Sequence, residues 1–595
     1  MTSANSHLGR AACLLAPVAE AVREAGEMLA AEFHRPAGPR GSGDKAPVDV
    51  EIEQFLRARL TALLATRFVG EEEGAGGEPA HGLCWVVDPN DGTRDFLQGH
   101  RGSAISVALL ADGRPVLGLV YAPLPPDRGP DLIAWAEGAG SLTRNGAAVE
   151  ARLAGESLAG GSIVLLSVGA RLRPEDYARL VAPARFIALP SIAYRLARVA
   201  VGDGVATATW NTLSPYDIAG GHALVAAAGG VMLDQQGVPV RYAANGEGRI
   251  DRLFAGAPAA ANLLRARERI LGPRRTLRVQ LGFPRESARA DRAIGCLLGQ
   301  VIGDSLGGRV EFQTRDEIRS RHPAGVQDLA DGGTWNILAG QPTDDSELAL
   351  ALARILVTER GYDDDAVAAS YARWWRSGPF DCGNTIRRAL ERANADRTSQ
   401  ANGALMRASP IGIAARTPEE AADWAARDCL LTHPHPTCIA ASAAFTAAIS
   451  AGIAGATPHE MSRAARVAAA RSPSGEPVSE RLAEAAAGRG PGDFTTQQGW
   501  VLTALQNAFR HLHSTRSPEQ ALIETVGEGG DSDTNAAIAG ALLGAAFGRD
   551  AWPRRWVLPV LSCRPMSEFG AARPRPEEYW PDDVPMLAEA LLPLR

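Results

Sequence analysis

Residues 85–96, WVVDPNDGTRDF, limit what this chain can fold into more than any other stretch of its 595 residues. The apolar run at 83–87 is typical of a buried strand, and it leads into a turn that carries Asp88 and Asp91. A second acidic group, Glu71 to Glu73, follows another short apolar segment earlier in the chain. Carboxylates that converge at one end of a sheet repel one another unless a divalent cation lies between them. The pattern therefore predicts a metal-assisted hydrolase site.

Three motifs carry a family resemblance in the first half of the chain: Glu71-Glu72, DPNDGT at 88–93 and YDIAGGH at 216–222. In this order they resemble the three signatures of the inositol monophosphatase superfamily. RDF at 94–96, with PVLGLVYAP at 115–123, is closer to the 3′(2′),5′-bisphosphate nucleotidase branch than to true inositol phosphatases. The resemblance implies a layered αβαβα fold and an Mg²⁺-dependent hydrolase of phosphate monoesters.

The same resemblance implies roles for single residues. The metal ligands would be the side chains of Asp49, Glu71, Asp88, Asp91 and Asp217, with the backbone carbonyl of Asn90. Gly92 and Thr93 would offer backbone N–H groups to the phosphate, and Thr93 and Glu71 would orient the attacking water. Asp217 alone would be interpreted as a helix cap. Beside the other two motifs, we interpret it as a ligand.

The chain contains a single lysine, Lys45, while nearly all other basic residues are arginine. A GC-rich genome explains the general shortage, but a retained lysine indicates a place where a compact charge is needed. Lys45 lies four residues before Asp49, where the family carries a lysine near the phosphate, and we interpret it as substrate-binding. Ser191, Ala193 and Tyr194 either line the substrate pocket or serve helix packing.

The length of the chain exceeds what one hydrophobic core usually organises, so at least two domains are expected. Periodic structure lapses within residues 271–287, where GPRR and GFPR occur. We therefore predict a first domain at 1–273, a linker at 274–286 and a second domain at 287–595. The second half is alanine-rich and helix-forming with few strand candidates, which predicts an all-α domain.

Charge and cysteine usage narrow the partners and the compartment. The net charge of −7, with acidic and basic residues interspersed, gives no basic surface for nucleic acid or an anionic membrane. The seven cysteines form no C-x-x-C pair, which fits a reducing cytoplasm and excludes a typical zinc site. Residues 11–19 could be the core of a signal peptide, but the helical period that continues to Leu29 favours an amphipathic first helix. No run approaches a membrane span.

Two acidic clusters mark the second domain: Thr343-Asp344-Asp345 and Asp531-Ser532-Asp533-Thr534. Each leads into a helix, so each could be a cap whose acids favour the helix dipole. Two such clusters, each with a threonine hydroxyl, favour instead an arrangement in which they face each other across two divalent ions. The helix predicted at 291–306 carries Gly295, Gly299 and Gly303 four residues apart, which predicts close helix packing in a soluble bundle.

The second half resembles the ADP-ribosylglycohydrolase family, which includes the glycohydrolase that reactivates dinitrogenase reductase. The motifs that carry this resemblance are GDSLG at 303–307, VEF at 310–312, TDD at 343–345, NGALMR at 402–407, TH at 432–433 and GDSDT at 530–534. The resemblance implies an all-α bundle that hydrolyses an N- or O-glycosidic bond to ADP-ribose, with a dinuclear Mg²⁺ or Mn²⁺ centre.

The implied metal ligands of this domain are Thr343, Asp344, Asp345, Asp531, Asp533 and Thr534, with Asp344 and Asp345 also catalytic. Asn402 and Gly403 would supply backbone near the diphosphate or the distal ribose, and Glu311 would be a mobile gate or an acid. The histidines of residues 432–436, THPHP, are interpreted differently. His435 fits a structural turn, and the role of His433 is left open.

Together the two halves predict a bifunctional cytoplasmic hydrolase. One domain would release ADP-ribose from a modified protein or small molecule. The other would hydrolyse a phosphate monoester of a nucleotide, such as 3′-phosphoadenosine 5′-phosphate, or of an inositol. Two alternatives are a glycohydrolase with a regulatory phosphate-binding domain, and an immunity or repair protein that counters an ADP-ribosylating toxin. Neither nucleic acid nor a membrane is expected as a partner.

Overall fold

The computed structural model describes residues 4–78, 82–150, 152–267, 287–392 and 395–592. The chain divides into two compact units, Met1–Leu277 and Arg278–Arg595, and each is described by itself. The predicted linker, residues 274–286, lies outside the described residues, so the predicted domain boundaries stay a prediction.

The first unit contains two sheets, one with the strand order β2-β1-β3-β4-β5-β6-β7-β8 and one with the order β10-β9-β11-β13-β12. Its strands are β1 (Arg67–Gly70), β2 (Ala75–Gly76), β3 (Leu83–Asp91), β4 (Ala104–Ala111), β5 (Arg114–Ala122), β6 (Asp131–Ala136), β7 (Thr143–Arg144), β8 (Ala147–Ala148), β9 (Ile163–Leu166), β10 (Arg185–Ala188), β11 (Ala206–Leu213), β12 (Val231–Leu233) and β13 (Ile250–Gly256). Its helices are α1 (Ala4–Phe33), α2 (Pro47–Leu63), α3 (Thr93–Leu97), the 3₁₀ helix η1 (Val168–Leu172), α4 (Pro174–Val181), α5 (Ile192–Ala200), α6 (Pro215–Ala227) and α7 (Pro258–Ala266).

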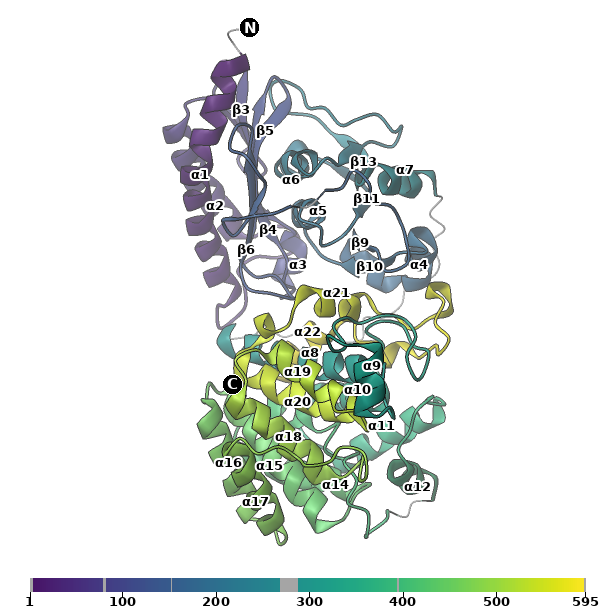
Figure 1. Cartoon of the computed structure of the whole chain (residues 1–595). Coiled ribbons are helices and arrows are strands. Elements are labelled where there is room, and N and C mark those ends of the chain that lie inside the picture. The colour runs from purple at the N-terminus through teal and green to yellow at the C-terminus, as the bar shows by residue number, and fades with distance from the viewer. Residues whose placement is uncertain (1–3, 79–81, 151, 268–286, 393–394, 593–595) are drawn as a thin grey trace. The chain divides into compact units, whose positions relative to one another are not determined.

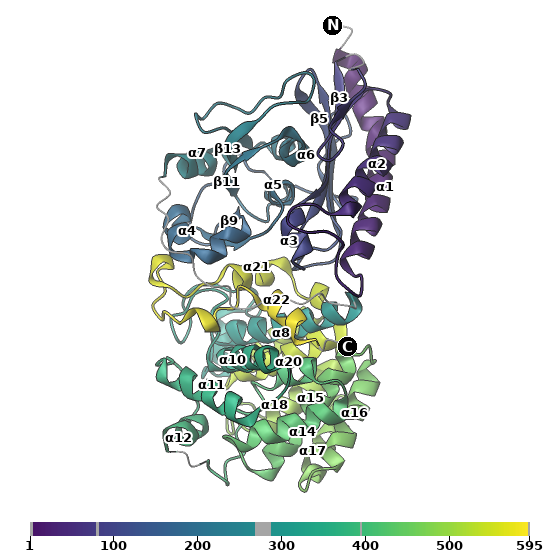
Figure 2. The ribbon, with the colours of Figure 1, turned by 180° about the vertical axis from the view of Figure 1, so that it is seen from behind.

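These elements form five layers (Figures 1 and 2). α1 and α2 cover one face of the larger sheet, α6 packs on its other face beside α5, the smaller sheet follows, and α4 and α7 pack against that sheet. The first layer follows from the helical period of the sequence, because Val22 and Leu29 of α1 and Ile52 and Leu56 of α2 are buried in one apolar cluster with the sheet. The predicted αβαβα fold is confirmed.

Strand β3 brings the first acidic motif to the site. It pairs in parallel with β1, with Val86 opposite Val69, and antiparallel with β4, with Asp88 opposite Ser106. The register with β4 shifts between Asp88 and Asp91. Residues three apart in a regular strand point to opposite faces of the sheet. The irregularity therefore allows both aspartates to reach the same site.

The second unit is helical, and its described residues contain isolated β-bridges but no named strand. Its α-helices are α8 (Ser287–Gly307), α9 (Arg315–Arg321), α10 (Asp344–Glu359), α11 (Asp364–Arg376), α12 (Asn384–Arg392), α13 (Ser409–Ala414), α14 (Pro418–Leu430), α15 (Pro436–Ile453), α16 (Pro458–Ala470), α17 (Gly475–Ala486), α18 (Val501–Ser514), α19 (Pro518–Gly527), α20 (Ser532–Phe547), α21 (Arg554–Ser562) and α22 (Val584–Leu591). Short 3₁₀ helices are η2 (Arg549–Ala551), η3 (Ser567–Phe569) and η4 (Glu577–Tyr579). The predicted all-α domain is confirmed.

α8 and α20 form the central pair of this unit, with α15, α18, α19 and α22 packed around them (Figure 1). Their backbones approach closely because small residues face each other. A Cβ atom on Gly299 would lie 2.3 Å from the carbonyl oxygen of Gly540, and one on Gly303 would lie 2.1 Å from that of Ala536. The predicted role of the glycine spacing in close helix packing is confirmed.

α15 corrects the expectation that no run approaches a membrane span. Its eighteen residues, Pro436–Ile453, are long and apolar enough to cross a membrane by length and composition. However, 83% of this segment is buried inside the protein, where it packs against α14, α16 and α20. Its composition is therefore that of the core helix of a helical domain.

Candidate functional sites

Three carboxylates meet at the end of β3. Asp88 and Asp91 come from the irregular end of this strand, and Asp217 comes from the first turn of α6. One carboxylate oxygen of each lies within 4.8 Å of those of the other two. Asp88 Oδ2 is buried without a hydrogen-bond partner among the described residues, an arrangement that is costly for an ionised oxygen. These oxygen donors fit a divalent cation such as Mg²⁺.

Glu71 joins this group from the loop after β1, where its carboxyl interacts with that of Asp88. Although Glu71 is exposed, desolvation of its carboxyl beside the group, together with the charges of Asp217 and Asp91, raises its pKa to about 8. Burial also raises the pKa of Asp217 to about 7, and that of Asp88 well above its ordinary value. Carboxyl groups that retain protons near neutral pH release them readily when a cation binds.

A residue that the sequence analysis missed holds the Glu71 loop in place. The Glu53 carboxylate, fully buried on α2, accepts the backbone N–H of Glu72 at 2.7 Å and that of Glu73 at 3.0 Å. Gly70 is required beside it, because a Cβ atom there would lie 2.2 Å from the Glu53 carboxyl carbon. The only sequence signal was an acid on the buried face of a predicted helix.

Asp91 is fixed by the start of α5. Its Oδ2 accepts a hydrogen bond from the Ser191 hydroxyl at 2.5 Å and one from the Ala193 N–H at 2.6 Å. Ser191 also caps α5, since its oxygen accepts the Tyr194 N–H at 2.8 Å. The two roles that were left open for this segment, site and helix packing, are therefore combined in Ser191. Tyr194 is buried and donates to Asp131 at 2.7 Å.

The structure places Asp49 beside Thr93 and not in the carboxylate group. Its two oxygens accept hydrogen bonds from the Asn90 side-chain amide at 2.9 Å and from the Thr93 hydroxyl at 2.8 Å. The backbone carbonyl of Asn90, predicted to bind metal, lies 2.9 Å from the same hydroxyl. Burial raises the pKa of Asp49 to about 7. Asp49 is thus arranged to orient Thr93, and its role as a metal ligand stays a prediction.

Other predicted residues of the first site lie at its edge. Gly92, with φ of +104°, makes the turn between β3 and α3, a conformation that favours glycine. Lys45 is exposed in the turn before α2. Its positive charge lowers the pKa of the Glu72 carboxyl and so opposes the rise that desolvation causes. Asp217 is both a cap and a member of the carboxylate group, because its Oδ2 accepts the Ser214 N–H at 2.6 Å.

In the second unit, the two predicted acidic clusters face each other. Asp344 and Asp345 begin α10, and Asp531 to Thr534 begin α20. Thr534 Oγ1 lies 3.4 Å from Asp345 Oδ2, so the clusters touch directly. Asp345 Oδ1 is buried without a hydrogen-bond partner among the described residues. As in the first unit, carboxylate and hydroxyl oxygens in this arrangement fit divalent cations.

Asp304 of α8 positions this site from behind. It accepts hydrogen bonds from the Thr343 N–H at 3.0 Å, the Thr343 hydroxyl at 2.9 Å and the Ser346 N–H at 3.0 Å. Thr343 Oγ1 also lies 3.1 Å from Asp345 Oδ2. The sequence analysis quoted Asp304 within a motif but gave it no role. Its carboxylate fixes the first turn of α10, from which the ligand candidates project.

A cavity of about 370 Å³ opens over these carboxylates. Its lining includes the predicted residues Glu311, Asp344, Asp345, Asn402, Gly403, Asp531, Asp533 and Thr534, together with Asp381 and His433. Burial raises the pKa of Asp344 to about 7 and that of Glu311 to about 8. Asn402 donates from its side-chain amide to Asp531 at 2.6 Å, a contact that the prediction of a backbone role did not include.

Asp381 is the most important residue that the sequence analysis missed. One of its carboxylate oxygens lies within 4.8 Å of those of Glu311 and Asp533. Burial and the charge of Asp344 raise its pKa to about 9. Two residues later, the Gly383 N–H donates to Asp344 Oδ2 at 3.1 Å, so this loop closes the site. A lone aspartate in a loop gave no spacing signal by which it could be found.

His435 and His433 have different places in the structure. His435 caps α15, where its Nδ1 accepts the Thr437 N–H at 3.1 Å, so its predicted structural turn is confirmed. His433 is 1% exposed and lines the acidic cavity. Its Nδ1 lies 2.8 Å from Thr432 Oγ1, and burial lowers its pKa to about 3. His433 is therefore an uncharged wall of the cavity at neutral pH.

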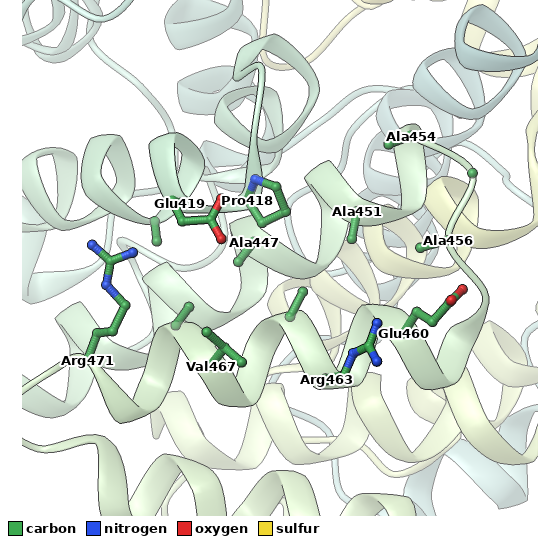
Figure 3. Close-up of a pocket in the computed structure, with 14 residues that line it drawn as sticks. Pro418, Glu419, Ala447, Ala451, Ala454, Ala456, Glu460, Arg463, Val467 and Arg471 are labelled. Atoms are coloured by element: carbon green, nitrogen blue, oxygen red, sulfur yellow. The ribbon is translucent and has the colours of Figure 1, made fainter.

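A larger hollow of about 540 Å³ lies between α14, α15 and α16 (Figure 3). Its floor is formed mainly by alanines such as Ala447 and Ala451, with Arg463 and Arg471 at its rim. None of the carboxylate groups described above lies in it, so size alone does not identify the chemical site. The carboxylate groups of this unit that could hold a metal line the smaller acidic cavity.

Comparison with known families agrees with the division into two units. The ADP-ribosylglycohydrolase family profile matches residues 285–580, and the inositol monophosphatase family profile matches residues 11–269. Both are families of hydrolases, and their members generally depend on divalent metals.

Three characterised relatives illustrate the two matches. ADP-ribosyl-[dinitrogen reductase] glycohydrolase of Rhodospirillum rubrum is 31% identical over 283 residues, which are 45% of this chain and 89% of the relative. ADP-ribosylarginine hydrolase Tri1 of Pseudomonas putida is 30% identical over 287 residues, 45% of this chain and 74% of the relative. 3′(2′),5′-Bisphosphate nucleotidase CysQ of Escherichia coli is 24% identical over 237 residues, 38% of this chain and 94% of the relative.

Proposed function

Because this chain belongs to the ADP-ribosylglycohydrolase family through residues 285–580 and to the inositol monophosphatase family through residues 11–269, we propose that it is a bifunctional, divalent-metal-dependent hydrolase of the cytoplasm. The second domain removes ADP-ribose from arginine in a modified protein. The first domain hydrolyses a nucleotide phosphate monoester such as 3′-phosphoadenosine 5′-phosphate. We infer arginine as the acceptor and a nucleotide as the ester because the relatives include an ADP-ribosylarginine hydrolase and a 3′(2′),5′-bisphosphate nucleotidase.

One observation carries the proposal for the second domain: the aspartates of α10 and α20 face each other beneath an acidic cavity. The residues proposed to hold two cations, Mg²⁺ or Mn²⁺, are Thr343, Asp344, Asp345, Asp531, Asp533 and Thr534, with Glu311 and Asp381 beside them. When bound there, the cations would supply Lewis-acid chemistry: they would bind hydroxyl groups of the substrate and make a water molecule more nucleophilic. Asn402 orients Asp531, and Gly403, which lies against His433, leaves room for the substrate.

In the first domain, Asp88, Asp91, Asp217 and Glu71 are the residues proposed to hold Mg²⁺. Asp49 orients the Thr93 hydroxyl, and Thr93 with Glu71 places the attacking water. Gly92 allows the ester to approach the turn closely, and the exposed Lys45 is proposed to contact the substrate phosphate. Thr93 is a catalytic residue in this proposal, whereas Asp49 is a positioning residue.

The test separates the two activities in the full chain. Two activities are measured with Mg²⁺ and with Mn²⁺. One is the release of ADP-ribose from a protein that is ADP-ribosylated on arginine, and the other is the release of phosphate from 3′-phosphoadenosine 5′-phosphate. Asp345→Asn should abolish the first activity and spare the second, and Asp91→Asn should do the reverse. No ADP-ribose release by the wild type would contradict the proposed arginine acceptor. Tight ADP-ribose binding without turnover would favour a binding role for that domain.

Phosphate release from inositol phosphates but from no nucleotide would contradict the proposed ester. Phosphate binding without hydrolysis would instead support the alternative in which the first domain is a regulatory binder. If ADP-ribose is released only from a protein that a particular toxin has modified on arginine, the alternative of an immunity or repair protein is supported.

A further inference from the structure

Three aromatic side chains that the proposed chemistry does not use lie beside the second site. We call Phe312, Trp335 and Phe380 the aromatic wall. The ring centroids of Phe312 and Trp335 are 6.3 Å apart with the rings edge to face, and those of Trp335 and Phe380 are 6.0 Å apart. The wall is joined to the carboxylate group, because the Trp335 indole N–H donates to Glu311 Oε2 at 2.6 Å. Phe380 directly precedes Asp381 in the sequence.

Phe312 combines an exposed apolar side chain with a strained backbone conformation. Its side chain is 55% exposed, although it lines the catalytic cavity, and its φ of +64° is a strained value for a bulky residue. Two backbone hydrogen bonds impose this conformation. The Phe312 N–H donates to the Gly530 carbonyl at 2.8 Å, and the Gly530 N–H donates to the Gln313 carbonyl at 2.9 Å. The loop that carries Asp531 thus fixes an exposed ring at the cavity, as expected of a ligand contact.

The charge of the cavity indicates what the wall contacts. Six carboxylates line the cavity, those of Glu311, Asp344, Asp345, Asp381, Asp531 and Asp533, and among the described residues no lysine or arginine lines it. Binding of two divalent cations would displace the protons of these carboxyl groups and balance four of the six negative charges that result. The remainder favours a cationic group of the substrate. A guanidinium stacks on aromatic faces and also pairs with carboxylates. Phe312 is the ring of the wall that lines the acidic cavity, Trp335 contacts Phe312, and Phe380 contacts Trp335, so the site matches a guanidinium on both counts.

We propose that the aromatic wall binds the guanidinium of the arginine that carries ADP-ribose, and so makes this site select arginine-linked over hydroxyl-linked substrates. The proposal rests on the proposed glycohydrolase function. Hydrolysis breaks the bond between the anomeric carbon and the guanidine nitrogen, water supplies a hydroxyl to the ribose, and a proton goes to the nitrogen. The released acceptor is again a guanidinium, so guanidinium compounds should bind to the wall as products do.

The experiment compares Phe312→Leu and Phe312→Tyr in the full, metal-loaded chain. The matched control is Phe547→Leu, because Phe547 is an exposed phenylalanine of the same unit, 43% exposed, that does not line the cavity. Three quantities are measured: KM for an arginine-linked substrate, KM for a serine-linked ADP-ribosyl peptide, and the affinity of agmatine by direct titration. ADP-ribose affinity is measured in parallel.

For Phe312→Leu we expect a rise of roughly 5- to 30-fold in KM for the arginine-linked substrate and an equal loss of agmatine affinity. The serine-linked KM, where turnover is measurable, and the ADP-ribose affinity should change less than about twofold, and Phe312→Tyr should restore most of the loss. Equal loss of ADP-ribose affinity would overturn the proposal, because the wall would then serve the nucleotide. Unchanged agmatine affinity would overturn it as well.

Failure of the proposed function gives a different result. If the wild type does not hydrolyse the arginine-linked substrate, the proposed function fails, and agmatine titration still decides the role of the wall. Agmatine binding that is lost in Phe312→Leu and kept in Phe547→Leu would then support a guanidinium site. Binding that is absent from the wild type would overturn it.

Discussion

The hydroxyl of Thr93 donates a hydrogen bond to Asp49 Oδ2 at 2.8 Å, and both side chains are buried. The second oxygen of Asp49 accepts the side-chain amide of Asn90 at 2.9 Å. With both oxygens engaged, Asp49 fixes the direction of the hydroxyl, and the lone pairs of Thr93 Oγ1 are left to accept a hydrogen bond from water. In the proposed reaction, a hydroxyl that accepts a hydrogen bond from water in this way would orient that water for attack and so contribute to the rate of phosphate release.

We therefore predict that Thr93→Val reduces phosphate release by roughly 100-fold or more, because valine keeps the shape and removes the hydroxyl. Thr93→Ser keeps the hydroxyl and should retain activity within about tenfold. The measurement is kcat for phosphate release, with ADP-ribose release by the same samples as the internal control. Near wild-type phosphate release by Thr93→Val would show that this hydroxyl takes no part in placing the water.

A second prediction concerns pH and metal. Burial raises the pKa of Asp344 to about 7 and that of Glu311 to about 8, from ordinary values near 4. Between pH 4 and pH 8 the metal-free folded state therefore binds more protons than the unfolded state, and its stability should fall as pH rises through this window. Bound cations replace these protons, so their stabilising effect should grow with pH.

Thermal unfolding of the full chain from pH 5.5 to 8.5, with EDTA and with Mn²⁺, checks this prediction. The melting temperature of the second unit should fall with pH in EDTA, and the difference between the two conditions should widen. Asp345→Asn identifies the transition, since it should reduce the Mn²⁺ effect on that unit alone. A difference that stays constant across the pH range would contradict the assignment of these carboxyl groups to metal binding.

A third prediction follows from the contact between α8 and α20. A Cβ atom on Gly307 would lie 2.4 Å from the Asp533 Cα, whereas one on Gly295 would lie 2.4 Å from the carbonyl carbon of Gly548, away from the site. Both alanine substitutions should destabilise the unit by about 1–3 kcal/mol through overpacking. Only Gly307→Ala moves a proposed ligand, so it should lower ADP-ribose release about 10- to 100-fold. Equal activities of the two variants would contradict this coupling.

Much of this arrangement could be predicted from the sequence because it depends on local patterns. The glycine spacing of Gly295, Gly299 and Gly303 is a property of one helix, and the acidic motifs bring their carboxylates together by position at helix and strand ends. Asp381, Trp335 and Glu53 could not be found in this way. Each acts through contacts with residues distant in sequence, and a lone acid or aromatic residue carries no spacing that distinguishes such contacts.

Asp49 illustrates the same limit in a predicted residue. The sequence predicted an acid close to the DPNDGT motif, and Asp49 does contact Asn90 and Thr93, but ligand and positioning roles require the same residue type. Only the bonds from Asn90 and Thr93 distinguish the two roles. Asp217 is the opposite case, since the cap and the ligand were considered as alternatives and the ligand was chosen, whereas the structure combines a capping bond with a place among the carboxylates.

A fourth prediction tests the residue that the sequence analysis missed. Asp381→Asn removes a carboxylate beside Glu311 and Asp533, and we expect ADP-ribose release to fall roughly 100-fold or more. Asp396→Asn is the matched control, because Asp396 lies outside the cavity lining and bonds to the neighbouring Thr398. ADP-ribose release, Mn²⁺ affinity and far-UV circular dichroism are measured together. A folded Asp381→Asn variant with wild-type turnover would show that Asp381 takes no part in catalysis or metal binding.

The last prediction concerns the buried ion pairs that hold α5, the helix that binds Asp91. Arg198 is 0% exposed and pairs with Asp127 at 2.8 Å and with Asp203 at 2.7 Å. Arg198→Met removes one partner of two buried carboxylates, which Arg128 and Arg144 still contact, so it should destabilise the first unit by about 1.5–3 kcal/mol. Arg179→Met is the control, because Arg179 is 60% exposed and its contact with Asp176 is 3.4 Å long. Its expected effect is within about 0.5 kcal/mol.

Urea unfolding of the full chain measures both changes. Phosphate release by Arg198→Met should also fall, because displacement of α5 moves the Ser191 and Ala193 donors away from Asp91, while ADP-ribose release stays unchanged. Loss of stability with full phosphate release would mean that the ion pairs support the fold without positioning Asp91. Unchanged stability would mean that Arg128 and Arg144, which also pair with these carboxylates, are sufficient when the Arg198 guanidinium is removed.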